Sequence, residues 1–219
     1  MKKNIPNLIT SLNLASGAVG IYFVLALAEL NAIYFVLAGA LFDLLDGLVA
    51  RLLKVSSELG KQLDSLADMV TFGLLPSFYI LMVLKEQSPL YWIAVLISIF
   101  SAIRLARFNI DETQSDSFRG LPTPANAIML TSLVFVPFQL SANAIIGITI
   151  LSCLLLVSNL RLIALKFTSF GWTGNEFRWG LIVGIVLLTF VFKWTVVPLL
   201  IPFYLLVSLV SVVKKTEVS

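Results

Sequence analysis

The feature that most constrains this sequence is a succession of apolar runs, each close to 20 residues long. The first is LITSLNLASGAVGIYFVLALA at residues 8–28, and similar runs follow as far as residue 213. A run of this length is what an α-helix needs to cross the hydrocarbon core of a membrane. Only 12% of the 219 residues are charged and 59% are hydrophobic, whereas a soluble domain carries far more charge. The sequence therefore predicts an all-α integral membrane protein.

Eight apolar segments can be delimited along the chain. They predict a polytopic bundle of about eight transmembrane helices in a single domain over residues 1–219, with core spans at 8–160 and two additional spans at 178–213. The basic start resembles a signal peptide, but its apolar run is too long, so we expect a retained first span. The predicted spans are 8–28, 31–53, 62–84, 89–109, 121–138, 142–160, 178–192 and 194–213.

Basic residues are distributed unevenly between alternate loops. With the N-terminus in the cytoplasm, 13 of the 15 lysines and arginines fall on the cytoplasmic side, and only Lys85 and Lys193 fall outside. Cytoplasmic loops of membrane proteins carry such an excess of Lys and Arg. We therefore expect both termini in the cytoplasm and a location in the cell (inner) membrane. The net charge of +3 is too small to predict nucleic-acid binding.

Four of the six aspartates lie close together, at Asp43, Asp46, Asp64 and Asp68. At 100° per residue, the first two share one helix face and the last two share a face of the next helix. Because the connection through Lys54 is short, these helices are expected to be antiparallel neighbours. Two carboxylates from each helix can then meet in one cleft near the cytoplasmic surface.

Carboxylates inside an apolar bundle need compensation, since one at mid-membrane costs about 3 kcal/mol. Clusters of oxygen ligands are what hard divalent cations require, so Mg²⁺ or Mn²⁺ is predicted here. Gly47, Ala50 and Gly60 share faces with the acids, where small side chains let a ligand approach the backbone or let helices pack tightly. The chain has no histidine and one cysteine, Cys153, so a general base must be a carboxylate, lysine, tyrosine or water.

Written out, the acidic stretch is D-x2-D-G-x2-A-R-x8-G-x3-D-x3-D. This pattern resembles the signature of the CDP-alcohol phosphotransferases at every fixed position. The resemblance implies that an acceptor hydroxyl attacks the distal phosphorus of a CDP-activated lipid or alcohol at the cytoplasmic membrane face and that CMP leaves. The matching residues are Asp43, Asp46, Gly47, Ala50, Arg51, Gly60, Asp64 and Asp68.

The resemblance also assigns roles to particular residues. It implies that the four aspartates bind one or two divalent ions, that Asp68 is the general base and that Asp64 takes part in catalysis. It further implies a homodimer, which is common in the family. The residues expected to contact the CDP group are Asn7, Thr10, Asp46, Gly47, Ala50, Arg51 and Gly60.

Three further stretches bear on the acceptor. IPNLITSLNLASG at the start, RLARFN at 104–109 and FRGLPTPANA at 118–127 resemble the branch of the family that accepts serine. This implies transfer of a phosphatidyl group from CDP-diacylglycerol, a membrane lipid, to the hydroxyl of L-serine. Arginine suits bidentate recognition of a carboxylate or phosphate. The candidates for binding serine or lipid phosphate are Arg104, Arg107, Asn109 and Arg119.

Other interpretations of these residues stay open at this point. Glycerol 3-phosphate or inositol phosphate as acceptor would also need arginines, and an archaeal-type lipid donor would use the same signature. The arginines also fit the role of topology anchors. An ion or proton transporter would place acids near the bilayer midplane, often with internal repeats. Here Arg51, Lys54 and Lys61 draw the cluster towards the inner face, and no repeat is evident.

Overall fold

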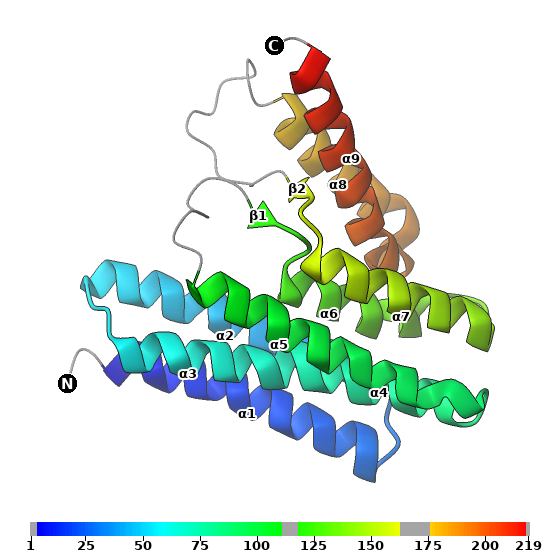
Figure 1. Cartoon of the computed structure of the whole chain (residues 1–219), viewed down its shortest axis with the longest axis horizontal. Coiled ribbons are helices and arrows are strands. Elements are labelled where there is room, and N and C mark those ends of the chain that lie inside the picture. The colour runs from blue at the N-terminus through cyan, green and yellow to red at the C-terminus, as the bar shows by residue number, and fades with distance from the viewer. Residues whose placement is uncertain (1–3, 111–117, 163–175, 218–219) are drawn as a thin grey trace.

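The computed structural model describes residues 4–110, 118–162 and 176–217. These residues form the predicted all-α fold, with one pair of two-residue strands (Figure 1). The helices are α1 (Asn4–Ala26), α2 (Ala32–Leu53), α3 (Glu58–Asp68), α4 (Leu75–Lys85), α5 (Val95–Ile110), α6 (Thr123–Thr131), α7 (Ala142–Val157), α8 (Glu176–Phe192) and α9 (Val197–Glu217). Short helical turns of other geometry are η1 (Met69–Leu74), η2 (Pro89–Ala94), η3 (Ser132–Phe135) and η4 (Lys193–Val196), and the strands are β1 (Phe118–Arg119) and β2 (Arg161–Leu162).

Helices α1 to α7 lie side by side, with α1 packed on both α2 and α3 (Figure 1). The start of α1, the end of α2, the start of α3 and the end of α5 come together at one end of this bundle. The hairpin of α8 and α9 stands at a steep angle to it. The acidic stretch of the sequence therefore lies at one end of the bundle, as its short connection predicts.

Five apolar segments of the described chain are long enough to cross a membrane, which confirms a helical membrane protein. The number eight and the cytoplasmic termini remain predictions. The span expected at 121–138 is only 13 residues long, because the helix ends before Pro137 and Val136 is extended (ψ 126°). A residue before proline disfavours helical geometry. The five segments are Asn4–Ala26, Ala32–Leu53, Glu58–Lys85, Pro89–Ile110 and Val183–Val210.

The last of these segments is not one straight helix. Lys193 has a positive φ of 51°, and the chain reverses direction there. As a result α8 and α9 lie side by side (Figure 1). The ring of Phe203 packs where a Cβ on Gly184 would be. This geometry matches the division of the C-terminal region into two predicted segments with a break at Lys193.

The third predicted span begins four residues earlier than residue 62. Ser57 caps the helix, since its hydroxyl accepts a hydrogen bond of 3.0 Å from the backbone N–H of Gly60. Such a cap satisfies an N–H group that has no partner inside the helix. The helix then runs through the π-helical turn η1 into α4 as one segment of 28 residues. Both Asp64 and Asp68 lie in its first half.

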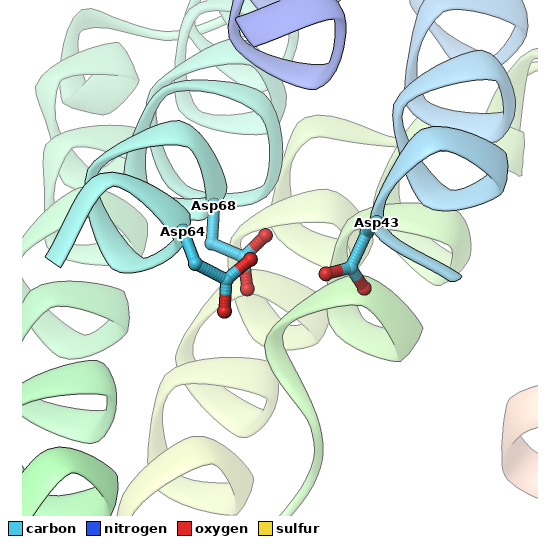
Figure 2. A group of neighbouring side chains, drawn as sticks. All are labelled: Asp43, Asp64 and Asp68. Carbon is cyan, nitrogen blue, oxygen red and sulfur yellow. The ribbon is translucent and has the colours of Figure 1, made fainter. Parts of the chain in front are cut away.

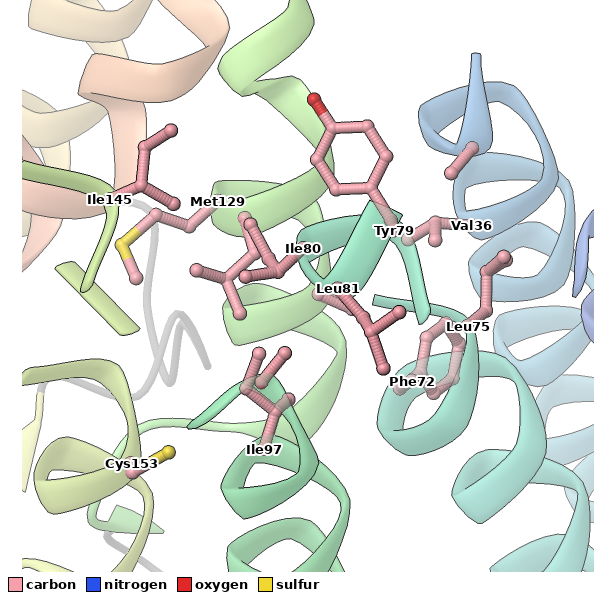
Figure 3. Close-up of a cluster of buried hydrophobic side chains, with 14 of the residues drawn as sticks. Val36, Phe72, Leu75, Tyr79, Ile80, Leu81, Ile97, Met129, Ile145 and Cys153 are labelled. Carbon is pink, nitrogen blue, oxygen red and sulfur yellow. The ribbon is translucent and has the colours of Figure 1, made fainter. Parts of the chain in front are cut away.

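The apolar core surrounds the second half of this segment (Figure 3). Phe72, Leu75 and Ile80 are fully buried, and Cys153 is buried there as a small apolar side chain. Many leucines on the outer faces of the helices are exposed instead, among them Leu44 and Leu52 on α2. An apolar exterior is what a helix needs in contact with lipid. The bundle therefore has an apolar core and an apolar exterior as well.

At the turn η1 the long helix approaches α1 and α2 closely. The Thr71 hydroxyl donates a hydrogen bond of 2.9 Å to the backbone oxygen of Asn13 in α1. A Cβ added to Gly17 of α1 or Gly39 of α2 would collide with the side chain of Thr71. Glycine is needed at both positions because the backbones come so close. These contacts fix α1 and α2 against the long helix directly after Asp68.

Strands β1 and β2 join two loops near the same end of the bundle, with Arg119 opposite Arg161. Gly120 follows β1 with a positive φ of 75°, and its N–H donates 2.9 Å to the carbonyl of Leu160. A Cβ on Gly120 would lie 2.8 Å from the carbonyl oxygen of Leu156. The chain therefore requires glycine here for both its backbone angle and the close approach, and the turn sets the start of α6.

Candidate active site

Three of the four aspartates converge between α2 and α3. Asp43 extends from α2, while Asp64 and Asp68 extend from adjacent turns of α3 (Figure 2). One carboxylate oxygen from each lies within 4.8 Å of the others. The helical spacing read from the sequence thus brings side chains from two helices together, as predicted.

The fourth carboxylate has a different environment. Asp46 is only 7% exposed, and it accepts a hydrogen bond of 2.6 Å from the hydroxyl of Thr10 in α1. The same hydroxyl lies 3.0 Å from the carbonyl oxygen of Pro6. Asp46 is still close enough to Asp64 and Asp68 for direct repulsion between the charges. The structure therefore divides the acids into a group of three and one neighbour held by α1.

Asp68 also has a partner in α1. The side-chain amide of Asn13 donates a hydrogen bond of 3.2 Å to Oδ1 of Asp68. Asn13 is fully buried, and its own Oδ1 has no hydrogen-bond partner. This hydrogen bond joins α1 to α3. The link of Asn13 to an aspartate was not predicted, because nothing in the sequence specifies which helix it faces.

The negative charge of the cluster is not balanced by ion pairs. Within the described ranges, no lysine or arginine lies within ion-pair distance of these carboxylates, and the charged groups that act on Asp68 are the other three aspartates. Arg51 is exposed, and its Nε donates 3.0 Å to the carbonyl of Gly47 in its own helix. Arg51 therefore does not balance the charge of an aspartate in this conformation.

The donor set fits a divalent cation. It consists of carboxylate oxygens only, and Oδ1 of Asp64 is buried without a hydrogen-bond partner. Ligand oxygens around one Mg²⁺ lie at most about 4.2 Å apart, given bonds of about 2.1 Å. Small side-chain rotations would bring Asp43, Asp64 and Asp68 from within 4.8 Å to that separation.

A cleft of about 220 Å³ opens beside the carboxylates, between α1, α2 and the start of α3. Six of the seven residues expected to contact CDP line this cleft, and Arg51 does not. No atom lies within 4 Å of a Cβ built on Gly47, so tight packing does not explain that glycine. The lining residues are Pro6, Asn7, Thr10, Asp46, Gly47, Ala50, Val55, Ser56, Ser57, Gly60, Lys61 and Asp64.

Lys61 is a cleft residue that we did not predict as a contact. It precedes Asp64 by three positions, so helical geometry places both on one side of α3. Its Nζ donates 3.0 Å to the backbone oxygen of Asn109, which ties the end of α5 to α3. The side chain of Asn109 donates 2.8 Å to the hydroxyl of Ser65. Asn109 thus lies beside α3 and does not line the cleft.

The predicted arginines point to different places. Arg104 turns into the bundle, where its Nη1 donates 2.6 Å to the hydroxyl of Thr123 at the start of α6. Arg107 is exposed, and its Nη1 lies 3.4 Å from the carbonyl oxygen of Val157. The backbone of Arg119 lies in β1, but its side chain falls outside the described part of the structure. Of Arg104 and Arg107, whose side chains the structure describes, Arg104 is the one that turns towards the acidic cluster.

Fold and site together define a helical membrane protein with a carboxylate cluster and an adjacent cleft at one end of its bundle. The chain belongs to the CDP-alcohol phosphatidyltransferase family, whose sequence profile matches residues 3–209. This confirms the family resemblance of the acidic signature. Membership of this family favours the transferase interpretation over an ion or proton transporter.

Similar proteins occur in several bacteria. A Helicobacter pylori protein is 37% identical over 166 residues, which cover 71% of this chain and 70% of the relative. A Bacillus subtilis protein is 36% identical over 133 residues, 60% of this chain and 75% of the relative. A Mycobacterium leprae protein is 36% identical over 147 residues, 64% of this chain, and the match spans about half (49%) of that relative. All three are named CDP-diacylglycerol–serine O-phosphatidyltransferase.

Proposed function

We propose that this protein transfers the phosphatidyl group of CDP-diacylglycerol to the hydroxyl of L-serine, with release of CMP and formation of phosphatidylserine. The observation that carries the proposal is the convergence of Asp43, Asp64 and Asp68 beside a cleft lined by six of the expected CDP contacts. The names of the relatives support serine as the acceptor.

Asp43, Asp64 and Asp68 are the residues that would hold Mg²⁺ or Mn²⁺. A divalent ion bound there supplies neutralisation of the diphosphate and of the charge that develops on the departing CMP. Asp46 borders both the cleft and the carboxylate group, so it is placed to complete the ligand set or to serve a second ion. Its bond to Thr10 would keep its carboxylate oriented in either role.

The cleft is the proposed position of the cytidine diphosphate. Gly47 and Ala50 leave open space along α2, so that a nucleotide can lie against the helix backbone. Asn7 and Thr10 contribute polar side chains from α1, and Lys61 contributes a positive charge from α3. A cation beside the cleft favours a diphosphate, because its charge is offset in a site that is partly removed from water.

Asp68 is the proposed general base. The bond that forms joins the serine oxygen to the phosphorus that carries diacylglycerol, and the bond that breaks joins this phosphorus to the CMP oxygen. The proton of the hydroxyl passes to the carboxylate of Asp68. Asn13 holds one oxygen of Asp68, which leaves the other oxygen free to face the acceptor. A carboxylate can take this role in a chain that has no histidine.

We further propose that the site opens to the cytoplasm and that the protein lies in the cell membrane. The support is the distribution of basic residues, of which 13 of 15 fall on the same side as the acidic stretch. A homodimer remains a prediction from the family resemblance.

The experiment that tests the function uses the purified protein in detergent. CDP-diacylglycerol, labelled serine and Mg²⁺ or Mn²⁺ are supplied, and CMP and labelled phosphatidylserine are measured. We expect both products in equal amounts and none after chelation of the metal. Product formation with glycerol 3-phosphate or inositol phosphate, but not with serine, would contradict the proposed acceptor.

A further inference from the structure

Tyrosine and tryptophan side chains on the outside of the protein gather at one end of the bundle. Among the side chains that the structure describes, the exposed ones of these two types are Tyr22, Tyr34, Trp92 and Trp194. Tyr22 lies near the end of α1, Tyr34 in the first turn of α2, and Trp92 in η2 just before α5. The end of α1 and the starts of α2 and α5 lie at the end of the bundle remote from the carboxylates (Figure 1).

Trp194, in the turn η4 between α8 and α9, is joined to this end of the bundle by ring contacts. Its ring centroid lies 5.7 Å from that of Phe135 in η3. The ring of Phe135 in turn lies 6.4 Å from that of Tyr34, at an angle of 72°. Aromatic pairs prefer separations of this size. The turn of the C-terminal hairpin therefore lies close to the start of α2.

Other exposed apolar side chains are not confined in this way. Exposed leucines occur along α2 from Leu37 to Leu52. Exposed phenylalanines include Phe108, near the acid-bearing end of α5, and Phe190 in α8. The ring of phenylalanine has no polar group, whereas tyrosine carries a hydroxyl and tryptophan an N–H that need hydrogen-bond partners. The confinement therefore follows the polar group of the ring and not apolarity alone.

Charged side chains lie at the same end as these four aromatic residues. Glu29 in the connection between α1 and α2 is exposed, as are Lys85 and Glu86 at the end of α4 and Lys193 beside Trp194. Charged groups need water, whereas the exposed leucines along the helices need lipid. A ring with one polar group is suited to the zone between these two environments.

We propose that Tyr22, Tyr34, Trp92 and Trp194 form one contact surface for the headgroup layer of a phospholipid bilayer, at the membrane face remote from the carboxylates. The rings lie among the first acyl carbons, and their O–H and N–H groups donate hydrogen bonds to headgroup or water oxygens.

The length of α2 agrees with this placement. Lys54 follows Tyr34 by about 20 residues, which is about 30 Å of helix and equals the thickness of the hydrocarbon core. The connection between α2 and α3, which lines the cleft with Val55, Ser56 and Ser57, then lies at the opposite membrane face. The aromatic surface would thus set the depth at which the cleft meets water.

The test locates two of the tryptophans in a bilayer. The full-length protein is reconstituted into nanodiscs of phosphatidylcholine whose chains carry bromine, a contact quencher of tryptophan fluorescence, either near the headgroup or near the chain ends. One variant keeps only Trp92 and another keeps only Trp194, with the other three of the four tryptophans replaced by phenylalanine. We expect the shallow bromines to quench each about twofold more than the deep ones, because interfacial rings lie at headgroup level.

The matched control is Leu151→Trp in the protein that has no other tryptophan. Leu151 is 57% exposed on α7 and lies about nine residues, or about 14 Å, from the start of that helix. This places it near the middle of the hydrocarbon core, so the deep bromines should quench the control more than the shallow ones.

Equal quenching by the two lipids, or stronger quenching by the deep bromines, at position 92 or 194 would overturn the single surface. Quenching by neither lipid, with the control quenched, would show that protein covers the rings and would overturn it too. If the variants without other tryptophans do not fold, spin labels on Trp92→Cys and Trp194→Cys in a Cys153→Ala background give the same comparison of depth. The readout does not involve phosphatidyl transfer, so it is independent of the proposed function.

Discussion

The two halves of the long helix Glu58–Lys85 differ sharply. In α3 only Ala67 is buried, and the helix carries Asp64 and Asp68, of which Asp64 lines the cleft. In α4 seven of 11 residues are buried, and five of them belong to the apolar core, namely Leu75, Tyr79, Ile80, Leu81 and Leu84. The same helix thus carries two carboxylates in its first half and packs in the apolar core with its second half (Figures 2 and 3).

The turn η1 separates these halves and determines how they relate. Its wider helical geometry follows Asp68 directly, and Thr71 is enclosed there by Gly17 and Gly39. π-helical turns are often found at functional sites. The role of α3 depends on the charges of its aspartates, whereas the role of α4 depends on apolar packing. The turn η1 links the two. Damage to the two halves should therefore be separable in experiment.

The largest effect is expected in the acidic half. Asp64→Asn and Asp43→Asn should lower kcat by about 100- to 1,000-fold, because each removes a charged ligand of the proposed metal. The melting temperature should stay the same or rise, since repulsion among the acids is relieved. Activity assays and thermal unfolding in detergent measure both. Glu58→Gln is the control, because it removes an exposed acid from the same helix. Full activity in both aspartate variants would contradict the metal site.

The apolar half should respond in the opposite way. Ile80→Ala removes a fully buried side chain from α4 and should lower the free energy of unfolding by about 2–4 kcal/mol, mainly through the cavity left behind. The activity of the protein that remains folded should be nearly unchanged. Leu59→Ala on α3, which is 70% exposed, is the control. A loss of kcat without a loss of stability would show that the two halves are not separable.

A substitution at the junction should affect both properties. Gly39→Ala places a Cβ against Cγ2 of Thr71 and 2.8 Å from Oδ1 of Asn13. Such overpacking costs about 1–3 kcal/mol of stability. It should also displace Asn13 from Asp68 and reduce activity. Adding Thr71→Ser removes Cγ2 but keeps the hydroxyl that bonds to Asn13, so the double variant should regain part of both. The absence of any rescue would place the strain elsewhere.

Loss of the hydrogen bond from α1 to Asp46 should have a moderate effect, and that effect should be confined to nucleotide affinity. Thr10→Val removes the hydroxyl that bonds to Asp46 and should weaken CDP affinity by about tenfold, as expected for a bond to a charged group. Thr10→Ser keeps the hydroxyl and is the control. Calorimetry with CDP and Mn²⁺ gives the affinity. Equal weakening in the serine variant would assign the effect to packing of the methyl group.

The smallest effect is expected at the start of α3. Ser57→Ala removes the helix cap and should cost about 1 kcal/mol of stability, whereas Ser57→Asp should retain most of it. Because Ser57 also lines the cleft, the KM for CDP-diacylglycerol is measured alongside thermal unfolding. A raised KM in a variant that keeps its stability would make Ser57 a ligand contact as well as a cap.

Much of the site followed from local rules. Helical periodicity placed Asp43 with Asp46 and Asp64 with Asp68, and the short connection made their helices neighbours. Periodicity did not show that Asp46 bonds to Thr10 and stands apart from the other three. That division depends on how α1 is rotated against α2, which is set by packing between distant segments.

The positions of the arginine side chains also could not be predicted from helical periodicity alone. RLARFN places Arg104 and Arg107 three residues apart, close enough in angle that either can face inward. In the structure Arg104 faces Thr123 and Arg107 is exposed. The sequence likewise does not indicate that the polar atoms of Ser101 and Asn126 are buried without a hydrogen-bond partner, because this depends on how α5 and α6 pack. A sequence shows that a polar residue is present, but it does not show whether a partner reaches it.

The sequence by itself determined the membrane class, the family and the acidic helix faces, because apolar length and helical spacing are local properties of the chain. The tertiary structure alone decided which acids cluster, which arginine turns inward and where α1 supports Asp46 and Asp68. These outcomes depend on helix rotation and on contacts as close as those of Thr71 with Gly17 and Gly39. Such contacts join residues far apart in the chain, so only packing of the whole bundle specifies them.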